Sequence, residues 1–220
     1  MNFMPELFGY LDRLAANNNR PWFQANKAEY ERLRALWMAD LQTVISLMAE
    51  GEPALRYVGA DACAYRIYRD TRFSPDKTPY KTYFSALISP TGRHCDRACW
   101  YLHLGAQECA VYSGLWQPKS KVLKKVRKAI VDNIDEFRGI IDEPRVAREF
   151  PGWYGPQLKT APKGYDRNHP DIDLLRLKEI GKCHYFDRSF FDNPEWPREV
   201  ADLALLLKPL NDFINYSIDE

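Results

Sequence analysis

The sequence predicts an α+β fold in which an antiparallel sheet is flanked by helices. Apolar residues recur every three or four positions toward both ends of the chain and every second position in its middle. Because these helical and strand patterns are grouped and do not alternate, the class is α+β and not α/β. The 220 residues match the size of one domain, so we expect residues 1–220 to form a single domain.

The N-terminal third is expected to be helical. A first helix should cover residues 7–14, and Pro21 should lie in the first turn of a second helix. Asn26 and Glu29 have the spacing of a capping box at the start of a long third helix. One buried stripe follows along that helix, made of Tyr30, Leu33, Trp37, Leu41, Val44 and Met48.

The middle and the end of the chain supply the sheet and further helices. Alternation predicts strands over residues 63–68, 84–89, 99–104 and 109–113, with a later strand over 182–186. Helical spacing returns over residues 122–130 and 134–141, and again over 195–214, where Pro209 should introduce a kink. Residues 151–170 are rich in Pro and Gly and predict a long irregular segment, which in a compact domain is often functional.

Composition excludes several classes of protein. The net charge of +1 gives no overall attraction to nucleic acid or to a membrane surface. No uncharged apolar run approaches the ~18 residues of a spanning helix, and the start of the chain lacks a signal-peptide pattern. Five cysteines without a disulfide framework favour free thiols in a reducing compartment. We therefore expect a cytoplasmic protein with no membrane partner.

The most informative segment is the charged block from Arg66 to Lys81. It holds five cations and two carboxylates, so its formal charge is +3 by subtraction: Arg66, Arg69, Arg72, Lys77 and Lys81 against Asp70 and Asp76. The block joins two predicted strands, which crowds like charges into a short connection. Such a surplus favours a phosphate or carboxylate, which guanidinium groups bind bidentately. The alternative is that Arg–Asp pairs and a buried tyrosine simply pin this loop to the body.

From this block we predict binding of a phosphate-bearing or other anionic small molecule. The expected ligand-binding residues are Arg66, Tyr68, Arg69, Arg72, Asp76, Lys77, Tyr80, Lys81, Trp116, Lys159 and Lys163. If the protein is a hydrolase or transferase, Asp70 and His169 are the candidate proton-handling groups. His169 can instead cap the helix that begins near Asp171. No phosphate-binding loop, dinucleotide motif or other cofactor motif is present.

A second interpretation is a non-catalytic module that binds nucleic acid or a protein partner. Its contacts would be the basic helix 119–128 and an aromatic sheet face. That helix carries Lys119, Lys121, Lys124, Lys125, Arg127 and Lys128, and the aromatic residues are Trp100, Tyr101, Tyr112 and Trp116. The competing reading of such a helix is a solvated surface.

The sequence also contains two sets of side chains with metal-ligand atoms. His94, Cys95, Cys99 and His103 offer zinc-ligand atoms, although their spacing matches no established zinc motif. Asp70 and Asp76 offer oxygen ligands for Mg²⁺, but the neighbouring cations lower carboxylate pKa values and compete with a metal. The sequence therefore favours no metal.

Several motifs also point to a family. They are Asn18, Arg20, Trp22 and Phe23; residues 66–74 and 76–81; Tyr101, Leu102 and His103; Gly114, Leu115 and Trp116; Arg127; and residues 158–159, 162–165 and 169–170. With these residues the sequence resembles the bacterial conserved hypothetical proteins catalogued as domain of unknown function 2461. The resemblance implies a single-domain bacterial protein and supplies no catalytic residues. His94 and four of the cysteines lie outside the family pattern, which weakens the zinc interpretation.

Overall fold

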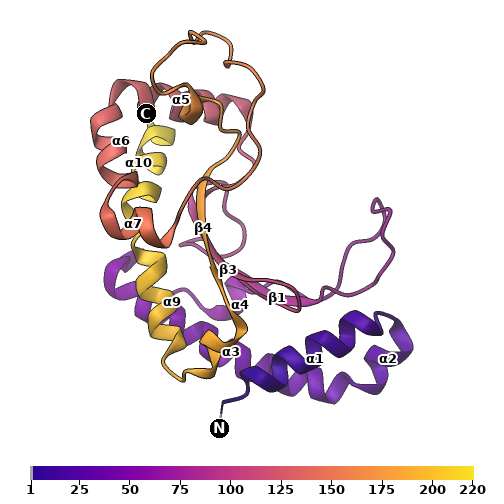
Figure 1. The fold of residues 1–220 in the computed structure, drawn as a ribbon. Helices are drawn as coiled ribbons and strands as arrows, with labels where there is room; N and C mark the ends of the chain where they lie inside the picture. The colour runs from indigo at the N-terminus through magenta and orange to yellow at the C-terminus, as the bar shows by residue number, and fades with distance from the viewer. Residues whose placement is uncertain (1) are drawn as a thin grey trace. The chain divides into compact units, whose positions relative to one another are not determined.

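Four strands form one antiparallel sheet in the order β1-β2-β3-β4 in the computed structural model, which describes residues 2–220 (Figure 1). The strands are β1 (Tyr83–Ile88), β2 (Cys99–Gly105), β3 (Cys109–Leu115) and β4 (Ile180–Phe186). The first three follow one another along the chain through short connections, as expected of antiparallel neighbours. Together with the helices, this sheet confirms the predicted α+β class.

Helices precede, interrupt and follow the strands. Before the sheet come α1 (Met4–Ala16), α2 (Arg20–Ala25), α3 (Lys27–Gly51), the 3-10 helix η1 (Pro53–Leu55) and α4 (Ala60–Cys63). Between β3 and β4 come α5 (Ser120–Asp132), α6 (Ile134–Ile141), α7 (Pro144–Glu149) and α8 (Ile172–Leu175). After β4 come the 3-10 helix η2 (Arg188–Asp192), α9 (Trp196–Leu205) and α10 (Lys208–Asp219). Within the described residues, 151–171 contain no regular helix or strand, in agreement with the predicted irregular segment.

The residues group into two compact units. Unit 1 consists of Met1–His94, Tyr101–Val111 and Tyr185–Asp202, and unit 2 of Cys95–Trp100, Tyr112–His184 and Leu203–Glu220. Strands β2, β3 and β4 each contain residues of both units. The single domain over residues 1–220 that the sequence predicts remains a prediction.

The core of unit 1 is the buried stripe of α3 packed against β1. The Trp37 and Phe84 rings lie 5.2 Å apart, and the Tyr30 and Phe84 rings stack at 5.9 Å. Every residue of the predicted stripe is buried, which confirms it. Burying each such side chain stabilises the fold by about 1.5–3 kcal/mol.

Two local predictions in unit 1 are wrong. Asn26 does not cap α3, because its side-chain amide donates to the Trp22 carbonyl at 2.8 Å at the end of the preceding helix. Residues 63–68 form no regular strand, because α4 occupies the start of this segment and only isolated bridges follow. The predicted alternation holds only at the end of this segment, where Ile67 is buried while Arg66 and Tyr68 are exposed; at its start, Cys63 and Ala64 are both buried.

Unit 2 is held together by polar contacts from buried positions as well as by aromatic packing. Trp100 donates its indole N–H to the Ala204 carbonyl at 2.8 Å, and the Phe137 ring lies 5.1 Å from that of Phe213. The predicted closing helix is two helices, α9 and α10, because Pro209 lies in the first turn of α10, where its missing N–H is tolerated.

The helices and the cysteines agree with two expectations from composition. Across residues 2–220, no helix combines the length and apolarity that crossing a membrane requires. All five cysteines are free thiols, as expected, and Cys63 and Cys109 are buried.

Candidate functional site: the Arg66–Lys81 arm and the Lys81 surface

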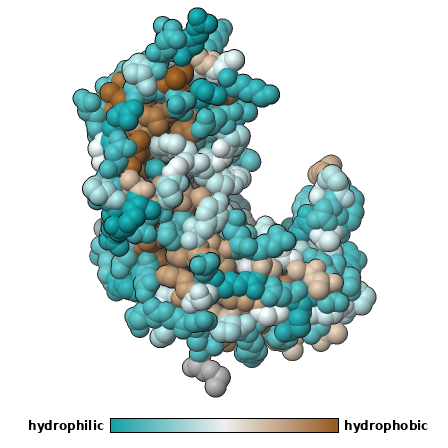
Figure 2. Space-filling model, in the orientation of Figure 1, coloured by the Kyte–Doolittle hydropathy of each residue, from teal (hydrophilic) through white to brown (hydrophobic). Residues whose placement is uncertain are grey.

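The charged block forms a long two-limbed loop in unit 1, here called the arm (residues 66–81). Its limbs pair through an antiparallel bridge between Tyr68 and Tyr80, and the Lys81 N–H donates to the Ile67 carbonyl at 2.8 Å. Figure 1 shows the arm extending from the strands of unit 1. Its surface is mainly hydrophilic with an apolar patch at its tip (Figure 2), where Phe73 is 91% exposed.

The base of the arm is fixed to the α1–α2 region. The Asn18 side-chain amide donates to the Tyr80 carbonyl at 2.8 Å and accepts from the Tyr80 N–H at 3.1 Å. The Phe23 and Tyr80 rings stack with their centroids 4.0 Å apart. Tyr80 is therefore only 3% exposed, so it packs in the core and does not wall a ligand as the sequence predicted. Tyr68, in contrast, stays partly exposed beside Phe23.

Charges at the end of the arm largely satisfy one another. Arg69 contacts the Asp76 carboxylate and the Thr78 hydroxyl, while Arg72 donates Nη2–H to Asp70 Oδ2 at 2.6 Å. Lys77 donates to the Thr71 carbonyl at 2.9 Å. Arg69 and Arg72 therefore each have a carboxylate partner within the arm, which is the arrangement that the alternative of a pinned loop requires.

The two carboxylates of the arm are kept ionised. The hydrogen bond from the Arg72 side chain lowers the pKa of Asp70 to about 2, and the Thr78 backbone N–H together with Arg69 lowers that of Asp76 to about 2. A carboxylate this acidic holds no proton near neutral pH. Asp70 is thus too weak a base to take up a proton near neutral pH, and both carboxylates are engaged by arginines.

Lys81 differs from the cations at the tip because it is half-buried at the base of the arm. Its ammonium lies 5.0 Å from the centre of the Tyr65 ring and 5.7 Å from that of Tyr83. Burial lowers the pKa of Lys81, and the nearby Arg66 guanidinium lowers it further. Within residues 2–220 neither Lys81 nor Arg66 forms an ion pair with a carboxylate. These two residues hold the uncompensated positive charge of this region.

Aromatic side chains of β1 and β2 continue the surface around Lys81. The Tyr83 and His103 rings lie 4.3 Å apart, and the Tyr101 hydroxyl is 3.5 Å from His103 Nδ1. These residues alternate with Phe84 and Leu102, so they face away from the buried side of the sheet. We call this group the Lys81 surface; it consists of Tyr65, Arg66, Lys81, Tyr83, Tyr101 and His103, all in unit 1.

His103 is a histidine on this surface whose place beside Lys81 the sequence does not predict, because its spacing from the cysteines suggests only a zinc ligand. Burial lowers the pKa of its imidazole, and Lys81 lowers it further against an opposing effect of Glu108. The imidazole is therefore neutral at pH 7 and able to accept a proton. The strand alternation that places His103 beside Tyr101 was visible in the sequence, but its neighbours from β1 and the arm were not.

We expect His103 to make the free energy of unfolding depend on pH below about 6.5, the ordinary histidine pKa. Its pKa is lowered in the folded state, so the unfolded chain binds more protons and stability falls as the pH drops through this window. His103→Gln should flatten that acid-side slope in urea unfolding between pH 7 and 5. His94→Gln removes an exposed imidazole and is the control. An unchanged slope in His103→Gln would contradict the buried neutral imidazole.

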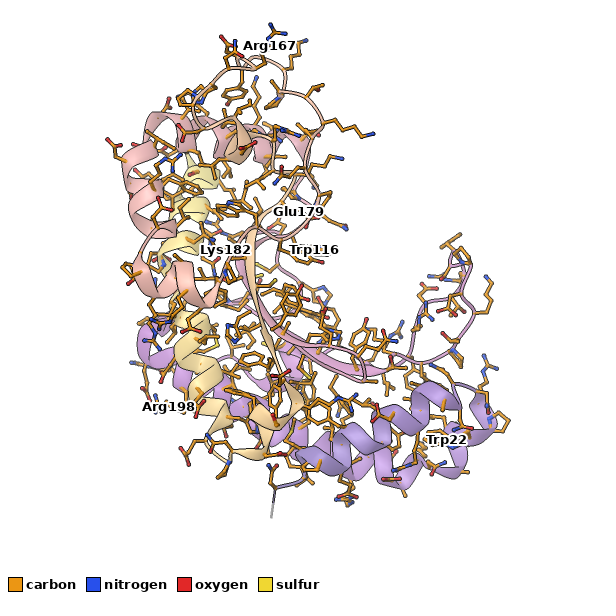
Figure 3. All side chains as sticks on the ribbon, viewed as in Figure 1. Trp22, Trp116, Arg167, Glu179, Lys182 and Arg198 are labelled. Atoms are coloured by element: carbon orange, nitrogen blue, oxygen red, sulfur yellow. The ribbon has the colours of Figure 1, made fainter. Side chains whose placement is uncertain are left out.

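The other predicted site residues lie in unit 2. Trp116 (labelled in Figure 3) is 59% exposed and stacks on Tyr154 at 5.4 Å. Lys159 and Lys163 are exposed, and Lys163 lines a surface hollow. His169 accepts the Asp171 backbone N–H at Nδ1 over 3.0 Å, which is a local contact in the loop before α8 (Ile172–Leu175) and not a cap, because α8 has no side-chain capping hydrogen bond.

The structure also bears on the predicted base-stacking residue Trp100 and on the two sets of metal-ligand side chains. Trp100 is only 4% exposed, with its indole N–H engaged, so the expectation that it stacks bases is wrong. In the part of the chain that the structure describes, no three His, Cys, Asp or Glu side chains gather in a way that could hold a metal ion.

Comparison with known proteins identifies a family and nothing narrower. The family model described as conserved hypothetical protein (DUF2461) matches residues 6–213. No curated protein and no solved structure matches the chain.

Proposed function

We propose that this chain, which belongs to the conserved hypothetical protein family DUF2461, binds a phosphate-bearing or other anionic small molecule on the Lys81 surface. The observation that carries the proposal is the half-buried Lys81 ammonium, which has two tyrosine rings and no carboxylate beside it within residues 2–220. Removing a charge from water without an opposite charge or a full set of hydrogen bonds is unfavourable. An anionic ligand would supply the missing partner.

Arg66 strengthens the case for an anion. Its guanidinium is exposed and close enough to Lys81 to lower the pKa of that ammonium. Two like charges side by side repel each other, and a phosphate or carboxylate placed between them would relieve the repulsion. Arg66 can bind such a group bidentately, whereas Lys81 contributes a point charge.

The aromatic residues suit the organic part of such a ligand. Burial raises the pKa of Tyr83, so its hydroxyl remains a neutral hydrogen-bond donor at pH 7. Tyr65 and Tyr101 lie with ring centroids 6.3 Å apart and add apolar surface with polar tips. If the ligand is a substrate for hydrolysis or group transfer, the neutral His103 imidazole can serve as a general base, whereas Asp70, although ionised, is too weak a base to take up a proton near neutral pH.

Thermal unfolding with a panel of anions tests this proposal. Inorganic phosphate, pyrophosphate, citrate and a set of phosphorylated metabolites are compared with sodium chloride at equal ionic strength. A ligand at 100 times its Kd stabilises the native state by about 2.7 kcal/mol, which raises the Tm of a chain this long by roughly 5–11 °C. We expect such a shift for at least one member of the panel.

Arg66→Gln should reduce the anion-dependent rise in Tm, because it removes one of the two uncompensated positive charges of the Lys81 surface. Arg56→Gln is the matched control, since Arg56 is an exposed arginine outside the arm. The proposal fails if no anion raises Tm above the sodium chloride control, or if both variants retain the full shift.

A further inference from the structure

Unit 2 contains a surface hollow that the Lys81 surface does not involve. It has a volume of about 560 Å³ and lies between the later turns of α5 and the loop around Gly164. Three lysines line it, namely Lys124, Lys128 and Lys163, together with Asp132 and Tyr165. Its volume is in the range of ligand sites, but its lining is charged where small-molecule pockets are mostly apolar.

The charges of this hollow do not balance. Lys128 is paired with Asp132 one turn further along α5. Lys124 and Lys163 form no ion pair within the described residues 2–220, so three ammonium groups against one carboxylate leave a formal charge of +2. Arg127 adds a further cation near Tyr165, with its Nη2–H donating to the Leu177 carbonyl at 2.7 Å. The Glu220 carboxylate also acts on Lys128, so the hollow keeps a moderate surplus of positive charge.

The positive charge extends beyond the hollow along one face of α5. Lys121, Lys124 and Lys128 are spaced by three and four residues, which places them on the same side of the helix. Seven residues of helix rise about 10 Å, so this row is longer than a single phosphate group. Of the other basic residues in α5, Lys125 is committed internally, since it donates to the Ile218 carbonyl at 2.9 Å.

An exposed aromatic ring shortly precedes this row in the sequence. Trp116 rests one face on Tyr154 and leaves 59% of its surface exposed. It precedes Lys121 by five residues, so their Cα atoms are at most about 18 Å apart. A ring held on a second ring is a rigid platform on which a base can stack.

We propose that unit 2 binds single-stranded nucleic acid, with the phosphodiester backbone along Lys121, Lys124 and Lys163 and a base stacked on Trp116. A row of flexible lysines suits successive phosphates without reading sequence, and an aromatic platform accepts any base. A small phosphate ester would use only the hollow and would leave Lys121 and Trp116 without a role. This site is independent of the anion site proposed for unit 1.

Fluorescence anisotropy with labelled (dT)20 and (rU)20 at 50–200 mM salt tests the inference. Binding of a single strand should weaken with salt at a slope of about −0.7 per phosphate contact. The double variant Lys124→Gln/Lys163→Gln should therefore lower that slope by about 1.4 and weaken binding at least tenfold. Trp116→Ala should weaken binding by about tenfold with an unchanged salt slope, because stacking releases no counterions.

Lys27→Gln is the control for the loss of a lysine charge elsewhere, since it removes one charge from an exposed helical lysine of unit 1. Lys81→Met should also leave oligonucleotide binding unchanged, which separates this site from the proposed function. The inference is overturned if neither oligonucleotide binds at 50 mM salt, or if the double variant binds as tightly as Lys27→Gln. It is also overturned if tripolyphosphate competes as strongly, per molecule, as (dT)20, because the occupant would then be a small phosphate.

Discussion

Lys81→Met is expected to abolish anion-dependent stabilisation while leaving a folded protein. Truncating a desolvated charge that contacts a ligand charge typically weakens binding by about 2–5 kcal/mol, which is at least roughly 30-fold. In the absence of ligand, Met keeps the apolar stem of the side chain against Tyr65 and Tyr83 and removes an ammonium whose burial is unfavourable. We therefore expect the unliganded free energy of unfolding to lie within about 1 kcal/mol of wild type or above it.

Lys77→Met is the matched control for this variant. It makes the same substitution in the same arm, at an exposed position whose ammonium contacts only the Thr71 carbonyl. Urea unfolding and the anion panel, applied to both variants, separate the two readings of the charged block. If Lys81→Met lowers stability by several kcal/mol without ligand, Lys81 is a structural cation and the proposed function loses its main support.

Phe23→Ala is expected to cause the largest loss of stability among these changes. The Phe23 side chain is fully buried, stacks on Tyr80 at 4.0 Å and meets the Tyr30 ring at 5.2 Å. Replacing a buried Phe by Ala costs about 3–5 kcal/mol, so Tm should fall by roughly 6–20 °C for a chain of this length. The cavity would also remove the ring that holds Tyr80, so the base of the arm should become more mobile.

Phe73→Ala provides the comparison within the same arm. Phe73 is 91% exposed, so its removal should change stability by less than about 0.5 kcal/mol. Calorimetry of both variants measures the difference, and hydrogen exchange at the Lys81 amide, which donates to the Ile67 carbonyl, reports on the arm itself. Similar Tm values for the two variants would contradict the anchoring role of Phe23.

Periodicity in the sequence identified the elements that depend on local burial patterns. The stripe from Tyr30 to Met48 predicted α3 because one apolar face is enough to select a helix. Alternation predicted β1, β2 and β3 because a strand with one buried face has an apolar residue at every second position. Where the prediction failed, at the Asn26 cap and in residues 63–68, the outcome depended on partners that are distant or compete locally, such as the Trp22 carbonyl.

In the charged arm, too, some features followed from the local sequence and others depended on tertiary contacts. The count of charged residues established that residues 66–81 carry a surplus of positive charge, and the alternation of an extended segment established that Ile67 faces opposite to Arg66. Only the tertiary structure decided which cations keep that surplus, because ion pairing depends on distances between side chains that no spacing rule supplies. Arg69 and Arg72 found carboxylates within the arm, while Lys81 was carried to the face of the sheet beside Tyr83 and His103, where burial makes an unpaired charge unfavourable.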